Sequence, residues 1–387
     1  MKRPLLIDIS RILWRRWRGS PSTGIDRACL AYLRHFADRA LAVVQRGGFT
    51  RVLAPQSSAR LATLLLEQRA DFRRLATREL ARALVGPGRH ADNRHGAIYL
   101  NVGHTGLDLP GHGRWVHGAR VSPIYYVHDI IPITHPHYCR AGEDERHRLR
   151  MRAALSLGRG IIANSQDTSE ALVDFAQREQ IAPPPMLVAP LALSVQRPLG
   201  AALPPIAAPY FLMIGTIEGR KNYRLALQAW RRLAARLGEQ APRLVIIGAR
   251  GWAADDVFHD LDTNALLRRF VIERGACSDA ELASYIAHAR ALLFPSFVEG
   301  QGLPLVEALA AGTPAIASDL AVFHEMAGNI PDYLHPEDVD GWVNAITCYL
   351  PENSAPRSAQ LMRLASFHAP VWEDHFRQVE SWIAGLH

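Results

Sequence analysis

The chain has 387 residues, a formal net charge of +7, 48% hydrophobic residues and 21% charged residues. This length exceeds one typical domain and fits two, and the composition is that of an ordinary globular protein, which excludes a disordered or fibrous chain. No apolar run is long enough to span a bilayer, and four scattered cysteines without a CxxC pair favour neither a disulfide framework nor a zinc site.

Charge is distributed unevenly along the chain. Residues 1–195 carry 28 Lys and Arg against 16 Asp and Glu, whereas residues 196–387 carry 16 against 21. A basic first half indicates an anionic partner, with a membrane surface, a phosphorylated lipid or a nucleic acid as candidates. An arginine-rich composition without any partner is the alternative. Because the sequence contains no recognisable DNA or RNA module, we expect no nucleic-acid partner.

The N-terminal stretch predicts a buried strand at residues 5–9. Residues 11–18 (RILWRRWR) then interleave Trp14 and Trp17 with arginines, which is typical of a membrane-interface segment, but a surface loop with partly packed tryptophans fits as well. The apolar piece is too short for a signal peptide. Next, Gly24 follows Ser22 and Thr23, either of which can cap a helix. Strand, glycine-containing turn and helix together predict the start of a Rossmann-like unit.

The rest of the first half continues this α/β pattern. Residues 58–85 predict one or two amphipathic helices with a basic outer face. Further strands are expected at residues 97–102, 121–127, 160–165 and 187–190. His128 follows one of them at its carboxyl end, where α/β sheets place ligands, and a histidine normally titrates near neutrality. His128 is therefore a candidate catalytic residue, the alternative being a histidine that is hydrogen-bonded to its own loop.

A proline- and alanine-rich stretch, residues 196–209, predicts an interdomain linker. We therefore expect one domain over residues 1–195 and a second over residues 210–369. A final amphipathic helix is expected within residues 370–387.

The second half begins with a predicted strand, residues 210–215, that leads through Thr216–Asn222 (TIEGRKN) into a helix. Lys221 and Lys2 are the two lysines among 44 basic residues. A compact ammonium group suits a phosphate, and Arg220 is a planar partner beside it. A basic surface loop is the alternative. Further along, Ser278 and Glu281 predict a capping box at a helix start.

The strongest motif is residues 294–319, FPSFVEGQGLPLVEALAAGTPAIASD. Glu299 and Glu307 stand eight positions apart. Pro304 marks the first turn of a helix, and Gly312 marks its end. One predicted strand precedes this loop and helix, and another follows them. The free N–H groups of a helix start bind anions. Carboxylates accept hydrogen bonds from hydroxyl groups, so a sugar joined to a phosphate suits this site. Alternatively, Glu307 only complements the helix dipole, and Glu299 is a solvated loop residue.

This segment resembles the E-x7-E motif of the retaining glycosyltransferases of family 4, with Gln301 in place of the usual Phe. In that family the first Glu contacts the donor sugar and the second holds the ribose, which implies these roles for Glu299 and Glu307. The loop at residues 215–222 is similar to the family's G-T-x-E-x-R-K-N loop, whose Arg and Lys neutralise the donor diphosphate. The resemblance implies a donor site that comprises Gly24, Gly215, Arg220, Lys221, Gly300, Gln301, Gly302 and Leu303, with His128 near the acceptor and the donor sugar.

The resemblance implies an α/β protein of the GT-B fold, with two Rossmann-like domains that face a central cleft and a final helix that crosses back to the first domain. It implies a retaining, metal-independent hexosyltransferase without cofactors, whose first candidate donor is GDP-mannose. The expected acceptor is a lipid-linked, lipopolysaccharide or other polysaccharide precursor, and the expected location is cytoplasmic, peripheral on the inner face of a membrane. A sugar-nucleotide epimerase of the same fold and a catalytically silent nucleotide-sugar-binding protein are the alternatives.

Overall fold

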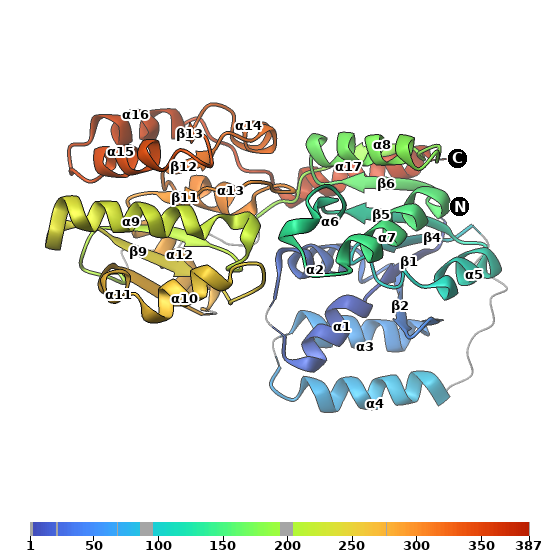
Figure 1. The fold of residues 1–387 in the computed structure, drawn as a ribbon. Helices are drawn as coiled ribbons and strands as arrows, with labels where there is room; N and C mark the ends of the chain where they lie inside the picture. Colours follow the sequence, from blue (N-terminus) through green and yellow to red (C-terminus); the bar gives the residue numbers. More distant parts are fainter. Residues whose placement is uncertain are drawn as a thin grey trace. The chain divides into compact units, whose positions relative to one another are not determined.

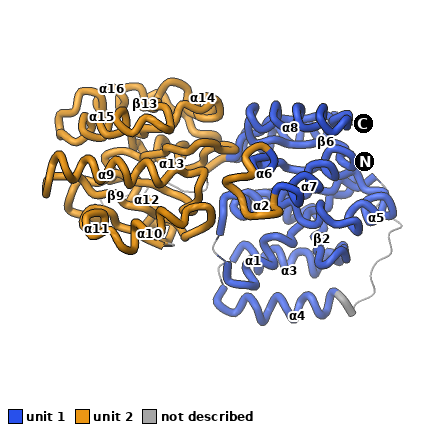
Figure 2. Tube along the Cα trace, viewed as in Figure 1, with its two compact units in different colours: residues 1–133, 144–191, 372–387 blue, residues 134–143, 192–371 orange. Residues whose placement is uncertain are grey.

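The chain divides into two compact α/β units in its computed structural model, which describes residues 3–20, 22–67, 69–85, 96–193, 204–275 and 277–386 (Figures 1 and 2). Unit 1 comprises residues 1–133, 144–191 and 372–387. Unit 2 comprises residues 134–143 and 192–371. The part of the expected linker at residues 196–203 lies outside the described residues.

Unit 1 is built on a seven-stranded sheet of order β3-β2-β1-β4-β5-β6-β7. Neighbouring strands are parallel, except that β2 and β3 form an antiparallel hairpin that was not expected from the sequence. The strands are β1 (Leu5–Asp8), β2 (Ala40–Arg46), β3 (Phe49–Val52), β4 (Ile98–Asn101), β5 (Ser122–Val127), β6 (Gly160–Ala163) and β7 (Met186–Val188).

Helices cover both faces of this sheet. One face packs against α5, α7 and α8 through Val116, Met151 and Phe175. On α2, the ring of Tyr32 contacts that of Tyr126 on β5 and those of His375 and Phe376 on α17. The helices are α1 (Ser10–Arg18), α2 (Gly24–Phe36), α3 (Pro55–Leu66), α4 (Phe72–Val85), α5 (Pro110–Ala119), α6 (Ile131–Thr134), α7 (Glu143–Leu157), α8 (Gln166–Arg178) and α17 (Trp372–Gly385).

The tryptophan- and arginine-rich stretch forms a packed helix, α1, and not a loop. Ile12 and Leu13 are buried. The Trp14 indole N–H donates to the Gln45 carbonyl at 2.8 Å, and the Arg46 guanidinium lies 4.9 Å from the Trp14 ring centroid. This helix is therefore anchored to β2 of the first sheet.

Unit 2 contains a six-stranded, fully parallel sheet of order β10-β9-β8-β11-β12-β13. Its strands are β8 (Tyr210–Ile214), β9 (Arg243–Ile247), β10 (Val271–Arg274), β11 (Leu292–Phe294), β12 (Ala315–Ser318) and β13 (Asp332–Leu334). Its helices are α9 (Tyr223–Leu237), α10 (Asp255–Thr263), α11 (Ala265–Phe270), α12 (Asp279–His288), α13 (Leu303–Ala310), α14 (Ala321–Ala327), α15 (Val339–Tyr349) and α16 (Ala355–Leu364).

Alternate residues of the second sheet enter two separate cores. Phe211 and Met213 pack with α9, α11 and α15, whereas Tyr210 and Leu212 pack with α12, α13, α14 and α16. A parallel sheet with both faces buried is the doubly wound arrangement, in which ligands bind at the carboxyl edge of the strands.

The local signals of the central motif are confirmed with small shifts. Helix α13 begins at Leu303, so Pro304 is its second residue, and Gly302 precedes it with φ +81°.

The capping box of α12 forms as expected, because Ser278 and Glu281 each bond the other's backbone N–H. Over the described residues, no helix combines the length and the apolar character needed to cross a bilayer.

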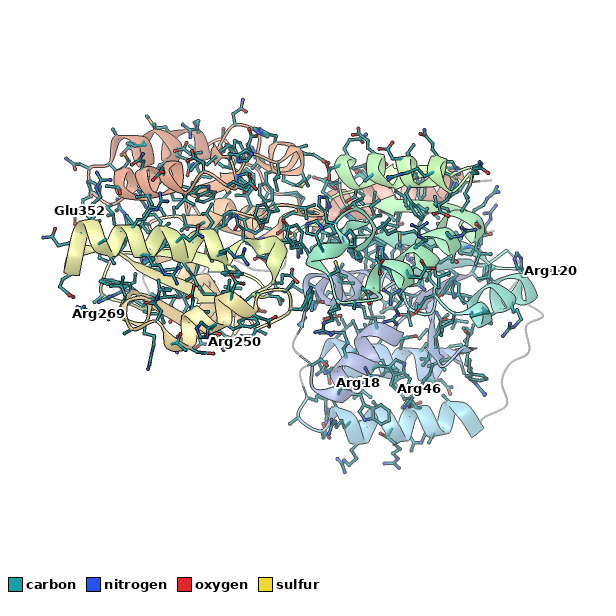
Figure 3. The ribbon with its side chains drawn as sticks, viewed as in Figure 1. Arg18, Arg46, Arg120, Arg250, Arg269 and Glu352 are labelled. Carbon is teal, nitrogen blue, oxygen red and sulfur yellow. The ribbon has the colours of Figure 1, made fainter. Side chains whose placement is uncertain are left out.

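Basic side chains occur at the surface of both units. Figure 3 labels Arg18, Arg46 and Arg120 in unit 1, and Arg250 and Arg269 in unit 2, all of which are exposed.

Candidate active site

The candidate site lies in unit 2, where two loops leave adjacent strands. Residues 215–222 follow β8 and residues 295–302 follow β11, and these strands are hydrogen-bonded neighbours in the sheet. Parallel neighbours present their carboxyl ends at one edge. The two loops therefore meet, although 78 residues separate Lys221 from Glu299.

The centre of the site is the carboxylate of Glu299, which binds two cationic side chains. Lys221 Nζ lies 2.5 Å from Oε1, and Arg220 Nη1 lies 2.7 Å from Oε2. Ser296 Oγ donates to Oε1 at 2.8 Å. Arg220 Nε in turn lies 2.7 Å from a second carboxylate, that of Glu218. The network thus pairs two cations with two carboxylates.

This network is buried, since the side chains of Lys221 and Glu299 are 8% and 7% exposed. Burial by itself would raise the pKa of Glu299, but Arg220 and Lys221 outweigh it and bring the pKa to about 2. Burial lowers the pKa of Lys221, and Glu299 opposes that shift. The carboxylate therefore stays ionised over the whole physiological pH range.

Lys221 is positioned by its surroundings as well as by its charge partner. Its ammonium group lies 4.7 Å from the centroid of the Phe294 ring. A Cβ on Gly215, whose φ is +131°, would lie 3.2 Å from Lys221 Cε. An ammonium group has three donors. Within the described residues, Glu299 is its one hydrogen-bond partner, so Lys221 retains capacity to bind an anion.

The start of α13 completes the site with main-chain groups. Gly302 makes no side-chain cap, Pro304 has no N–H, and the Leu305 N–H donates to the Gly302 carbonyl at 2.9 Å. Within the described residues, the Leu303 N–H is therefore the donor in the first turn of this eight-residue helix that is left for another acceptor. Gln301 and Glu307 are both buried, at 4% and 6% exposure, whereas Gly300 is partly exposed. A Cβ on Gly302 would lie 2.7 Å from Phe323 Cε1, so this turn requires glycine.

Two residues of the network were missed by the sequence analysis. Glu218 and Ser296 are 4% and 0% exposed, and both bond the cation–carboxylate network directly. The only signal in the sequence was their place in the two loops that carry Arg220 and Glu299. A polar side chain within two or three residues of such a group is worth including in a predicted site.

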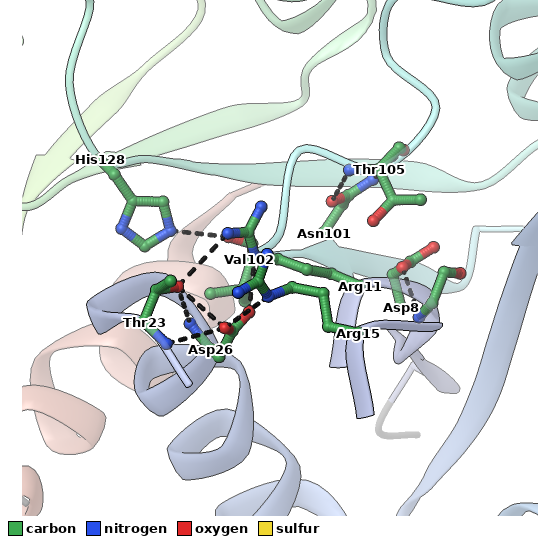
Figure 4. Close-up of polar contacts among 10 residues, drawn as sticks. Asp8, Arg11, Arg15, Thr23, Asp26, Asn101, Val102, Thr105 and His128 are labelled. Carbon is green, nitrogen blue, oxygen red and sulfur yellow. Dashed lines mark hydrogen bonds and ion pairs between the residues drawn. The ribbon is translucent and has the colours of Figure 1, made fainter. Parts of the chain in front are cut away.

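The two remaining predicted residues, His128 and Gly24, belong to unit 1. His128 is buried, and its Nε2 donates to the Val102 carbonyl at 2.8 Å (Figure 4). Burial lowers the pKa of His128 to about 4, although the Val102 carbonyl opposes this shift. The imidazole is therefore neutral at pH 7, with its proton on Nε2, and Nδ1 is a hydrogen-bond acceptor.

Gly24 is the first residue of α2, directly after its cap. Asp26 bonds back to Thr23 in a capping box, and Arg11 and Arg15 each place Nε 2.8 Å from one oxygen of the Asp26 carboxylate (Figure 4). Two arginines of the basic N-terminal segment thus form ion pairs within the protein. Gly24 itself is exposed.

The structure therefore brings together Gly215, Arg220, Lys221, Glu299 and the turn before α13. No cluster of three or more His, Cys, Asp or Glu side chains suited to a metal ion occurs in the described part of the chain. The two cations and the Leu303 N–H can bind an anion, and the ionised carboxylate can accept hydrogen bonds from neighbouring hydroxyl groups.

The sequence is similar to those of known glycosyltransferases. Residues 203–358 match the family model "Glycosyl transferases group 1". The chain is 34% identical over 165 residues to O-antigen chain mannosyltransferase B of Escherichia coli, which covers 43% of each chain. It is 30% identical over 257 residues to the serotype-specific mannosyltransferase WbdA of Escherichia coli, covering 61% of this chain and 31% of the relative. The chain spans less than half the length of these curated relatives.

The similarity to solved structures covers almost the whole chain. HepE of Anabaena, solved in complex with UDP, superimposes with a TM-score of 0.66 at 16% identity, over 99% of this chain and 100% of that one. Sucrose-phosphate synthase of Thermosynechococcus elongatus gives a TM-score of 0.63 at 16% identity, over 100% and 99%. These similarities show that the chain has the GT-B fold expected from its sequence.

Proposed function

We propose that this chain, whose residues 203–358 carry a Glycosyl transferases group 1 domain, is a glycosyltransferase that moves mannose from a nucleoside diphosphate to a saccharide acceptor. The observation that carries the proposal is the buried network of Lys221, Arg220 and Glu299 at the carboxyl edge of the second sheet. The similarity to O-antigen mannosyltransferases supports mannose as the sugar and a polysaccharide precursor as the acceptor.

The departing nucleoside diphosphate is the charge that such a site must stabilise. Lys221 and Arg220 carry the positive charge, and the Leu303 N–H at the start of α13 adds a main-chain donor. Preorganised donors of this kind contribute roughly 3 kcal/mol each to transition-state stabilisation. In this proposal they act without a metal ion, Glu299 accepts hydrogen bonds from the sugar hydroxyls, and Glu307 holds the ribose.

His128 has an orienting role in this proposal. Its neutral ring, with the proton fixed on Nε2 by the Val102 carbonyl, presents Nδ1 as an acceptor for a hydroxyl group. An imidazole with a pKa of about 4 is a weak base at pH 7, so it is poorly suited to take a proton from the acceptor hydroxyl. We therefore assign His128 to substrate orientation, in a reaction that retains the anomeric configuration.

The test is calorimetry with GDP-, UDP-, ADP- and dTDP-sugars on the wild type and on Glu307→Ala. We expect one nucleotide class to bind, GDP-mannose first, and its affinity to fall in the variant. Transfer to a saccharide acceptor in the presence of a chelator then tests metal independence, and the anomeric configuration of the product tests retention. A new nucleotide sugar formed without acceptor would identify an epimerase, and binding without turnover would identify a silent binding protein.

We also propose that unit 1 associates with an anionic membrane surface, as a lipid-linked acceptor requires. The support is the charge of residues 1–195 and the exposed arginines of α4, namely Arg73, Arg74 and Arg78. Flotation with vesicles that contain anionic lipid should recover the protein at low salt and lose it at high salt, because exposed charges are screened. Absence from the vesicle fraction at low salt would contradict this proposal.

A further inference from the structure

Residues 134–143 come from the first half of the sequence but belong to unit 2. The segment begins six residues after His128 and contains a short 3-10 helix, Pro136–Tyr138. It ends at Glu143, where α7 starts and the chain continues in unit 1. Because the chain on either side of this segment belongs to unit 1, contacts with other residues of unit 2 must hold the segment there.

Contacts with Phe297 and Trp252 of unit 2 hold this segment. The ring of Tyr138 stacks on that of Phe297, with centroids 5.4 Å apart and an interplanar angle of 7°. The indole N–H of Trp252 donates to the Tyr138 carbonyl at 2.9 Å. The guanidinium of Arg140 lies 4.6 Å from the centroid of the Trp252 ring. Aromatic stacking, a hydrogen bond and a cation–π contact therefore converge on one short segment.

The groups that receive these contacts belong to the loops of the candidate site. Phe297 stands two residues before Glu299, and its N–H donates to the Arg220 carbonyl at 2.8 Å. Gly219 stands directly before Arg220, and a Cβ there would lie 3.2 Å from Tyr138 Cδ1. The Gly219 N–H donates to the Trp252 carbonyl at 3.2 Å. Tyr138 thus lies against both loops at the point where they are joined.

We propose that residues 134–143 form a brace for the donor loops and that Tyr138 is a positioning residue for Glu299 and Arg220. The inference rests on the proposed glycosyltransferase function and adds a residue that neither loop contains. Because Tyr138 stacks on Phe297, two residues before Glu299, it limits the positions that the Glu299 carboxylate can take.

The test measures turnover per binding site in Tyr138→Ala, Tyr138→Phe and Met362→Ala. Calorimetric titration with the nucleoside diphosphate that the wild type binds gives the number of competent sites. The rate of sugar transfer is then expressed per site, together with KM. We expect Tyr138→Ala to lower kcat per site by about ten- to a hundredfold, as misplaced catalytic groups do, with KM changed much less. Tyr138→Phe keeps the ring and should restore the wild-type rate, and the exposed Met362 on α16 is the control.

Each outcome decides between the possibilities. A merely structural role for Tyr138 would reduce the number of competent sites and leave kcat per site unchanged, which would overturn the brace. If Tyr138→Ala does not fold, Tyr138→Leu keeps an apolar side chain but removes the stacking on Phe297, and an unchanged kcat per site would overturn the brace equally. A wild type that binds and transfers no sugar would instead overturn the proposed function, and the brace with it.

Discussion

Lys221 is buried beside Glu299 and is the one lysine of the second half of the chain. If it neutralises a departing diphosphate, Lys221→Ala should lower kcat by roughly 10²- to 10³-fold, the usual loss when one preorganised donor is removed. Steady-state rates with the identified donor measure this loss. Arg224→Ala is a matched control, because it removes a nearby exposed cation that pairs only at the surface with Asp256. Wild-type turnover in Lys221→Ala would contradict the diphosphate role.

Gly302 has φ +81°, and a methyl group there would lie 2.7 Å from the Phe323 ring. Gly302→Ala should therefore destabilise the fold by at least about 1–2 kcal/mol, from the left-handed backbone alone. Gly118, which lies in α5 with open space around it and ordinary φ, is the control. Gly118→Ala should be neutral or stabilising. Denaturant unfolding followed by circular dichroism compares the two, and equal midpoints would show that the turn tolerates a side chain.

The residues of the candidate site could be predicted from the sequence, but the contacts between their side chains could not. Glu299 and Lys221 were both predicted as site residues, yet neither the 2.5 Å ion pair nor the part of Ser296 in it followed from local pattern. That ion pair depends on β8 and β11 being neighbours, although β9 and β10 separate them in the chain. Likewise, the neutral state of His128 depends on burial, which shifts its pKa to about 4.

Helix α12 illustrates how much a local signal fixes at the scale of an element. Its capping box was predicted from Ser278 and Glu281 because cap, first turn and box lie within four residues. By contrast, the hairpin of β2 and β3 was missed, and residues 11–18 were interpreted as a loop or an interface segment. Helix α1 is stabilised by contacts with distant residues, including the hydrogen bond of Trp14 to Gln45.

The capping box of α12 gives a prediction that is independent of the candidate site. Ser278→Ala removes the side-chain acceptor for the Glu281 N–H and should lower the free energy of unfolding by about 1 kcal/mol. Ser278→Thr keeps a cap and should lose much less. Chemical denaturation of both variants measures the difference, and a loss of the same size in both would assign the effect to packing instead of capping.

At the scale of the whole molecule, the two units should respond differently to acid. Burial lowers the pKa of four histidines, and in the described part of the chain all of them belong to unit 1: His104, His112, His128 and His375. A histidine whose folded pKa lies below 6.5 binds its proton more readily in the unfolded chain. Unit 1 should therefore lose stability as the pH falls from 6.5 to 4, on the order of 3 kcal/mol for each shift to about 4.

Two carboxylates modify this expectation in known directions. Burial raises the pKa of Asp8 in unit 1, so its protonation partly offsets the loss there. In unit 2, Glu299 has a pKa of about 2, so its contribution is lost only as the pH falls below 4.5. Hydrogen exchange resolved by segment between pH 7 and 4 should show unit 1 opening first. His112→Gln should weaken that pH dependence, and simultaneous opening of both units would contradict the assignment.

The path of the chain has a consequence for biosynthesis. Helix α17 packs His375 and Phe376 against Tyr32 of α2, yet the whole of residues 192–371 is translated between them. Because domains fold as units while the ribosome extends the chain, the rest of unit 1 can fold before α17 has been translated. The nascent first unit then leaves the aromatic face of α2 uncovered, which makes it a natural substrate for chaperones until α17 emerges.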